Sequence, residues 1–410
     1  MTTRRAVLAG GAALVMLPWP ARAAAQDAHA ALDAARAERD PATALRLLAA
    51  LDVARLAPSA RLDVVTARAG LAVDRAIVAR GIDPRAKPAG SPNAALLALL
   101  LRRKLGDGLD FGAITTRLER EHAQCDRRAA VLFDAIGVTG ATIGARFTAL
   151  WRDPRYLCPD SDAGRAAAIV EMNRWLARFA ALVPALVGAV PAYCRDVAAL
   201  QPTPADLAAG RVGVRTLPEP GKAGSYVVDL THVRDRPRWS LPSVVAHELL
   251  PGHMLQLPIE AAAAPHPLRL DYAPAFAEGW GIHAERLIAR SGAYADDPRT
   301  ELGQLHWRLF RIGRARVDLA IHLHGLSRDA ARARLVAWQG EPVAFAPFDA
   351  DLARIAQEPM IRAAEMLAAL AIEDGARGRT GAALRRYHHM VLDHGRMRSD
   401  ELARRARRLT

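Results

Sequence analysis

The sequence predicts a mainly helical protein. Alanine and leucine, which favour helices, are abundant, and aromatic residues, which are common in strands, make up only 5% of the chain. The alternation of apolar and polar residues that marks strands is scarce. With 410 residues, the chain is long enough for one large domain or two lobes with a substantial core.

The first 23 residues have the pattern of an export signal. Two consecutive arginines precede an apolar run over residues 6–17, and Ala21 and Ala23 form a small-residue cleavage pattern, as in twin-arginine signals. The apolar run is too short to remain as a membrane span. A chance arginine pair in a frayed N-terminus is the alternative. We expect removal of residues 1–23, which leaves a periplasmic or secreted protein without an integral membrane segment.

Residues 24–205 are predicted to form a helical scaffold region. Asp40-Pro41 breaks a first pair of antiparallel helices, and Pro184 and Pro191 should bend the last helix. The predicted helices cover residues 26–80 as the antiparallel pair, 94–105, 111–136, 142–151 and 163–200, with a loop over 81–92.

Three cysteines, Cys125, Cys158 and Cys194, lie in this scaffold region. In an oxidising compartment they are compatible with one disulfide and one free thiol, and equally with three small buried side chains. None lies in a Cys-x-x-Cys pair or beside a candidate catalytic histidine.

Residues 206–410 are predicted to carry the function, and this region begins with a β-hairpin. Residues 212–216 and 225–230 are short and rich in strand-forming types, with a Pro-Glu-Pro-Gly loop between them. A strand beside a cleft can align an extended peptide by main-chain hydrogen bonds, and Tyr226 and Val228 are our substrate-binding candidates on it. A hairpin that only covers helices is the alternative.

A cluster of histidine and carboxylate residues follows the hairpin. An apolar helical stretch leads into His247-Glu248 and, after Pro251-Gly252, into His253. Neutral imidazoles ligate Zn²⁺, and a neighbouring carboxylate can take a proton from a water at the metal. We therefore predict a hydrolytic zinc site. The alternative is a core histidine, with Pro-Gly merely ending a helix.

The spacing of the two histidines requires a break in the helix. Six residues at about 100° each put His247 and His253 on nearly opposite faces of a regular helix. Pro251 cannot donate a hydrogen bond to the carbonyl of His247, and Gly252 tolerates unusual backbone angles. The helix should therefore bulge or break between Leu250 and His253, which can bring both imidazoles to one metal.

The third metal ligand is predicted at Glu278. One more protein ligand leaves a tetrahedral position open for water, and a glutamate on a following helix is a common choice. Glu285 lies on the same helix face, where it can hydrogen-bond a ligating histidine from the second shell. Surface carboxylates are the alternative, which is equally open for Glu285 because Arg286 follows it.

A long helix predicted over residues 298–326 contains further candidates. Asp318 and His322 stand one turn apart, so the carboxylate can fix the tautomer of the imidazole. If this helix faces the metal, His322 can donate to the oxyanion that forms when water adds to a carbonyl. A purely structural role for His322 is an equally open alternative. The candidates for binding the C-terminal carboxylate of a peptide are Arg311, Arg314 and Arg362, with Arg362 as our substrate-binding choice.

The net charge of +13 is carried almost wholly by arginine. These arginines are scattered through helical segments together with aspartate and glutamate, and no basic stripe alternates with aromatic residues. The pattern therefore argues against a nucleic-acid partner.

The two motifs resemble the paired signature of the family known as domain of unknown function 885. They are His247-Glu248-x-x-Pro251-Gly252-His253 and Glu278-Gly279-Trp280-x-x-x-x-Glu285, and weaker similarity runs over residues 224–375. The resemblance implies a mostly helical metallopeptidase fold with a deep cleft, similar to helical gluzincins such as angiotensin-converting enzyme. It also implies that His247, His253 and Glu278 are zinc ligands and that Glu248 is the general base.

Two positions depart from that pattern. His283 stands where members tend to have tyrosine. Residues 359–365 correspond to a Pro-Gly-Gln-x-x-x-Tyr motif, and Glu365 takes the place of the tyrosine that is expected to steady a transition-state oxygen. Loss of that hydroxyl would lower catalytic efficiency or remove catalysis.

The predicted function is that of an exported peptidase with one zinc ion per chain, which hydrolyses small or unfolded peptides. Two alternatives stay open. One is a zinc-binding but inactive protein that binds peptides or envelope fragments, and the other is a helical structural protein without a metal. The sequence leaves the oligomeric state open.

Overall fold

The computed structural model describes residues 19–86, 92–108, 110–343 and 347–409, and it confirms a mainly helical fold with a small β-sheet. Of the predicted export signal, residues 1–18 lie outside the described residues, and the expected cleavage pattern falls within the first helix. Among the described helices, none has the length and apolarity needed to cross a membrane.

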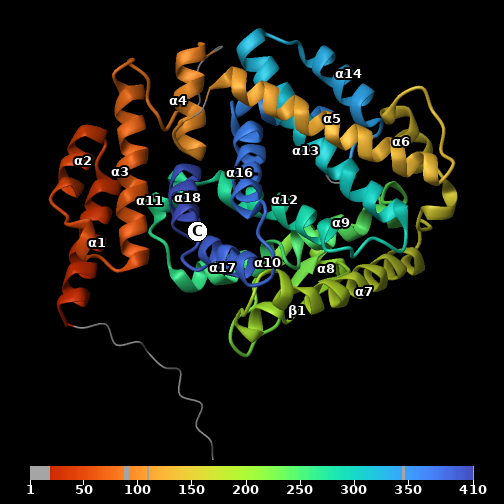
Figure 1. Cartoon of the computed structure of the whole chain (residues 1–410), viewed down its shortest axis with the longest axis horizontal. Coiled ribbons are helices and arrows are strands. Elements are labelled where there is room, and N and C mark those ends of the chain that lie inside the picture. Colours follow the sequence, from red (N-terminus) through yellow and green to blue (C-terminus); the bar gives the residue numbers. More distant parts are fainter. Residues whose placement is uncertain (1–18, 87–91, 109, 344–346, 410) are drawn as a thin grey trace, which may run out of the picture.

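Three helices form one end of the molecule, where we predicted two (Figure 1). Asp40 caps the second helix, since its side chain accepts hydrogen bonds from the backbone of Ala42 and Thr43, and a further break precedes Pro58. The apolar faces of these helices share a core with Leu268 and Tyr272. The helices are α1 (Trp19–Ala37), α2 (Pro41–Ala49) and α3 (Pro58–Val78).

The next helices agree with the predicted ranges, except for the end of the last one. Side chains of Asn93, Asp110 and Thr142 cap three of them, as their residue types indicate. The fourth ends well before residue 200, because the chain turns at Gly188 (φ +105°) and Pro191 lies beyond the helix. The helices are α4 (Ala94–Leu105), α5 (Phe111–Ala135), α6 (Ile143–Trp151) and α7 (Asp162–Leu186).

The sheet has three strands in the order β1-β3-β2, and the predicted hairpin supplies two of them. Strands β2 and β3 are antiparallel, as predicted, whereas β1 pairs parallel to β3 and comes from a segment that we had predicted to be helical. Tyr226 of β3 is paired with Ala199 on one side and Arg215 on the other. The strands are β1 (Val197–Leu200), β2 (Val214–Thr216) and β3 (Gly224–Val227), with α8 (Pro204–Ala208) after β1.

The centre of the molecule consists of helices that pack on one another (Figure 1). Helix α16 packs on α12 and α13, while α5 lies across α13 and α9 packs against α7, α12 and α13. These helices are α9 (Leu241–Glu248), α10 (His253–Ala263), α11 (Pro267–Tyr272), α12 (Ala275–Arg290), α13 (Pro298–His324) and α16 (Ile361–Ala376). Around them lie α14 (Arg328–Gln339), α15 (Phe348–Gln357), α17 (Gly381–Leu392) and α18 (Ser399–Ala406).

The two largest apolar cores draw on both of the regions that we predicted. One joins Phe179 of α7 to Val245 of α9, and the other joins Phe133 of α5 to Leu309 of α13. The scaffold region and the region with the candidate site therefore share their cores, and α7 and α5 fix where α9 and α13 lie.

All three cysteines are free and buried. Burial raises the pKa of Cys125 to about 11, so its reactive thiolate form is scarce at neutral pH.

We predict that protein purified without a reductant shows no reactive thiol in its native state and three after unfolding in denaturant. The reason is burial of all three sulfur atoms, and titration with a thiol-reactive dye measures it. A single thiol after unfolding would instead show that two of the cysteines form a disulfide.

Candidate metal centre

The helix that carries the first histidine breaks where Pro251-Gly252 predicts. Helix α9 ends at Glu248 and α10 begins at His253, and the peptide bond between Leu250 and Pro251 is cis. A Cβ atom on Gly252 would lie 1.9 Å from the carbonyl oxygen of His247, so only glycine fits at this position. The break replaces the turn that would have directed the two imidazoles apart.

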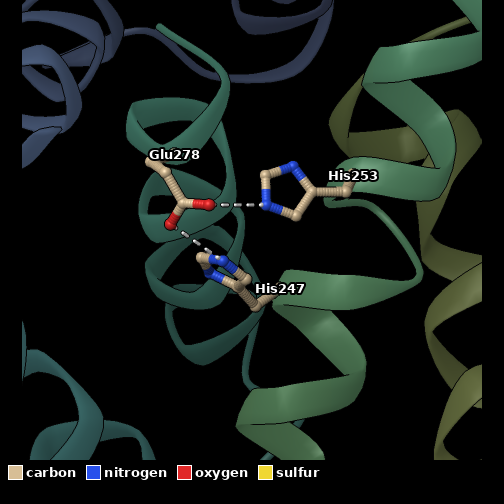
Figure 2. A group of neighbouring side chains, drawn as sticks. All are labelled: His247, His253 and Glu278. Carbon is tan, nitrogen blue, oxygen red and sulfur yellow. Dashed lines mark ion pairs between the residues drawn. The ribbon is translucent and has the colours of Figure 1, made fainter. Parts of the chain in front are cut away.

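His247, His253 and Glu278 point toward one another from three helices, α9, α10 and α12 (Figure 2). The distance from His247 Nε2 to Glu278 Oε2 is 3.5 Å, and that from His253 Nε2 to Glu278 Oε1 is 3.4 Å. One donor atom from each residue lies within 4.8 Å of the other two. The structure therefore brings together the three residues that we predicted as ligands.

His253 shows that this group fits a cation. Its side chain is buried, its Nδ1 has no hydrogen-bond partner in the described part of the chain, and its Nε2 makes no regular hydrogen bond but faces Glu278 Oε1 at 3.4 Å. An unsatisfied buried polar atom costs about 1–3 kcal/mol, and native structures seldom leave one without a reason. Two imidazoles and one carboxylate are a donor set that suits zinc.

Glu285 lies behind His247 and contacts its Nδ1, as predicted. The distance from its Oε1 to His247 Nδ1 is 2.7 Å, and its Oε2 accepts a hydrogen bond of 3.0 Å from Ser243. With the Nδ1 proton donated to Glu285, Nε2 of His247 is left to face Glu278.

The histidines and carboxylates of the site set each other's protonation. Burial and the charge of Arg311 oppose a proton on His247, but the hydrogen bonds with Glu278 and Glu285 outweigh both and raise its pKa to about 9. Burial raises the pKa of Glu278, yet the two histidines outweigh it and hold that pKa well below its ordinary value. Glu278 is therefore a carboxylate, the form that binds a cation.

Helix α12 approaches His247 closely because Gly281 has no side chain. A Cβ atom on Gly281 would lie 2.6 Å from Cε1 of the His247 ring. The same helix contributes Glu278 and Glu285, and Trp280 donates a hydrogen bond of 2.9 Å to the carbonyl oxygen of Pro251. One helix therefore positions both carboxylates and contacts the break between α9 and α10.

Glu248, the predicted general base, lies beside the group of ligands and is paired with Arg215 of β2. Arg215 Nε donates a hydrogen bond of 2.8 Å to Glu248 Oε2, and Nη2 contacts the same oxygen. Burial raises the pKa of Glu248, but the positive charges of His247 and Arg215 outweigh it and lower that pKa. No sequence motif marked Arg215, which reaches Glu248 through the pairing of the sheet.

A pocket of about 640 Å³ opens onto His247, Glu248 and Glu278. Tyr226 and Arg362, two of our substrate-binding candidates, line it. The third, Val228, is wrong: its side chain is fully buried in the core, and its backbone N–H donates to Leu200. Strand addition to 225–230 is also wrong, because β3 is the central strand and both of its edges are paired.

The structure does not bring His322 to this pocket, which contradicts the role that we predicted for it. Its Nε2 lies 3.0 Å from the backbone carbonyl of Ile355. Asp318 accepts hydrogen bonds from three backbone N–H groups at the start of α16 and so caps that helix. Arg311, eleven residues earlier on α13 and about 16 Å along its axis, is the residue of this helix that reaches the ligands.

Comparisons with known proteins agree with these motifs and this fold. The family model described as bacterial protein of unknown function, DUF885, matches residues 5–405. The chain belongs to this family. A search of functionally curated proteins gives no match.

Two solved structures have the same fold. The crystal structure of a putative lipoprotein from Colwellia psychrerythraea has a TM-score of 0.68 and 22% sequence identity, covering 94% of this chain and 69% of that one. A putative lipoprotein of unknown function from Shewanella oneidensis has a TM-score of 0.63 and 13% identity, covering 93% and 72%.

The positions that depart from the family's pattern have distinct places. Glu365 lines the pocket, where it accepts hydrogen bonds from Arg362 and Arg314. Met360, at the position of the glycine in that motif, has a left-handed φ of +68°. His283 lies outside the pocket, buried with its Nε2 3.0 Å from that of His388.

We predict that Gly281→Ala lowers the free energy of unfolding by about 1–3 kcal/mol, because the added methyl group overlaps the His247 ring. Gly313→Ala on α13 is the matched control, since the one close contact of its methyl group is the end of the flexible Leu335 side chain, at 3.0 Å, and the contact with Trp338 at 3.6 Å is of ordinary length. Denaturant unfolding of both variants measures the difference. Equal stability of the two would contradict the close packing of α12 on His247.

Proposed function

We propose that the protein is a zinc-dependent peptidase that hydrolyses small or unfolded peptides. The observation that carries this proposal is the convergence of His247, His253 and Glu278, in which Nε2 of His253 faces Glu278 at 3.4 Å and its Nδ1 has no hydrogen-bond partner among the described residues. Glu248 beside this group and the adjoining pocket supply a base and room for a substrate. Membership of the family is compatible with this function but names no activity.

His247, His253 and Glu278 would hold the ion, and Glu285 would keep His247 in the tautomer that ligates. A bound zinc ion supplies Lewis acidity, which makes a nearby water easier to deprotonate. Arg215 binds Oε2 of Glu248, and Oε1 has no hydrogen bond with the described residues. Oε1 of Glu248 then takes the proton of the attacking water and delivers it to the amine that leaves.

The pocket favours an extended peptide over a folded protein. Its walls combine Tyr226, Trp307 and Phe310 with several arginines, so they offer apolar contact together with charge. Because both edges of β3 are paired, a peptide that adds to the sheet would have to use an outer strand, β1 or β2, and Val212 and Gly213 next to β2 line the pocket.

We propose export through the twin-arginine route, as the pattern over residues 1–23 predicts. The two structurally similar proteins are described as putative lipoproteins, which supports a place in the cell envelope. The twin-arginine route carries folded proteins, so the site would fill before export.

A second candidate is a zinc protein that binds peptides or envelope fragments without cleaving them. The observation in its favour is Glu365, which stands where the family's pattern has tyrosine and is neutralised by Arg362 and Arg314. A digest of a peptide library with the zinc-loaded protein separates it from the peptidase.

We predict about one zinc ion per chain in protein purified without chelators, and loss of that zinc in His253→Ala. Glu285→Gln should retain zinc with an affinity lowered about 10-fold to 100-fold, because it removes only the partner of His247. The exposed residue His389 gives the control variant His389→Ala. Elemental analysis and a zinc titration measure these values, and full zinc content in His253→Ala would contradict the ligand set.

We predict that Glu248→Gln abolishes peptide hydrolysis yet leaves zinc bound. The amide cannot take the proton of the water, whereas its oxygen can still accept from Arg215. Glu301→Gln is the control, because Glu301 also pairs with an arginine, Arg128, but lies at the surface. Hydrolysis of a fluorogenic peptide library by each variant is the measurement. Retained activity of Glu248→Gln would refute the assignment of Glu248 as the general base.

A further inference from the structure

Seven arginines are buried in the described chain, and Arg311 is the one whose nearest carboxylate oxygen is farthest away. Six of them have a carboxylate oxygen at 2.8–3.4 Å. For Arg311, the nearest is Oε1 of Glu285 at 3.6 Å, followed by Oε2 of Glu278 at 3.8 Å. A buried charge without a closely bonded partner costs free energy, so this guanidinium is poised for another anion.

The two carboxylates near Arg311 already have other partners. Glu285 is bonded to His247 and Ser243, and Glu278 faces both histidines. A cation among the ligands would bind Glu278 further and would add positive charge beside Arg311. An anion that enters from the pocket would relieve that repulsion.

Arg311 is placed to meet such an anion. Its side chain lines the pocket, and its Nη2 lies 3.4 Å from Nδ1 and 3.5 Å from Nε2 of His247. The rings of Trp307 and Phe310 pack against the guanidinium, with their centroids 5.3 Å and 5.7 Å from Cζ. The buried Nε has no hydrogen-bond partner in the described chain.

We propose that Arg311 is a catalytic residue that binds the negatively charged oxygen formed at the scissile carbon. The inference rests on the proposed peptidase function and names the residue that steadies its transition state. Arg362 and Arg314 are engaged by Asp351 and Glu365, so they are not free for this role.

The bonds and charges of the step balance with the groups at hand. The water oxygen bonds to the carbonyl carbon as Glu248 takes the proton, and the electron pair of the C=O double bond moves to the carbonyl oxygen, which Arg311 stabilises. When the C–N bond breaks, that pair re-forms the carbonyl, and the amine leaves with the proton from Glu248. Glu365, which replaces a hydroxyl donor in the family's pattern, accepts hydrogen bonds from two arginines, Arg314 and Arg362.

The first test is the kinetics of Arg311→Gln and Arg311→Lys. We expect kcat of Arg311→Gln to fall about 10²-fold to 10³-fold, with KM within about threefold, because the interaction exists only in the transition state. Arg311→Lys keeps the charge and should recover part of the loss. Arg334→Gln is the control, since Arg334 lies outside the pocket, is exposed and has no ion pair in the described chain.

The second test does not depend on turnover. A peptide phosphonate, whose tetrahedral anion resembles the hydrated carbonyl, is titrated calorimetrically into each zinc-loaded protein, and zinc content and Tm are measured alongside. We expect Arg311→Gln to weaken phosphonate binding by about the same factor as kcat, at unchanged zinc content. The uncleaved peptide itself should bind with equal affinity to Glu248→Gln and to the double variant that combines Glu248→Gln with Arg311→Gln.

Unchanged phosphonate affinity in Arg311→Gln, or an equal loss in Arg334→Gln, would overturn the inference. A lower Tm without an effect on phosphonate affinity would also overturn it, because Arg311 would then only balance the charges of Glu278 and Glu285. If phosphonate binding depends on Arg311 in a protein that cleaves no peptide, the proposed peptidase activity is refuted. The same result would support Arg311 as the anion-binding residue.

Discussion

Two histidines six residues apart can reach one point only if the helix between them is interrupted. On a regular helix their side chains would diverge around the axis and lie about 9 Å apart along it. The interruption between Glu248 and His253 removes this separation. It is fixed from within by the contact of Gly252 with the carbonyl of His247, and from outside by the hydrogen bond of Trp280 to Pro251.

Helix α12 supplies the carboxylates that contact the histidines, so the site needs both this helix and the break. It carries the third candidate ligand, Glu278, and about two helical turns further on it carries Glu285, which orients His247. Gly281, between them, lets the helix approach the imidazole. The buried position of the group then decides its electrostatics: Glu278 stays ionised because of the histidines, and Arg311 lies beside it without a close carboxylate. A cation and an anion from the pocket are the two groups that would complete this arrangement.

The sequence allowed much of this to be predicted, because the decisive signals are local. Capping residues such as Asp110 mark helix starts, and Pro251-Gly252 marks the break. Histidine and glutamate within a few residues of one another indicate a metal even without knowledge of the fold. Glu285 followed from helical periodicity relative to Glu278.

The errors concern contacts between distant segments. Nothing near residues 197–200 indicates pairing with β3, so the segment was predicted as helix and β3 as a strand with a free edge. Arg215 reaches Glu248 through the same sheet and has no motif of its own. His322 was predicted at the site because Asp318 stands one turn away and because its helix was expected to face the metal. Helix α13 is 27 residues long, however, and it reaches the ligands at Arg311.

The central claim is that His247, His253 and Glu278 hold one cation together. X-ray absorption at the zinc edge of the zinc-loaded protein tests it most directly. The account predicts two imidazole nitrogens at about 2.0–2.1 Å from the zinc and a carboxylate oxygen at about 2.0–2.2 Å from it. A spectrum with sulfur ligands, or one without imidazole nitrogen, would contradict it.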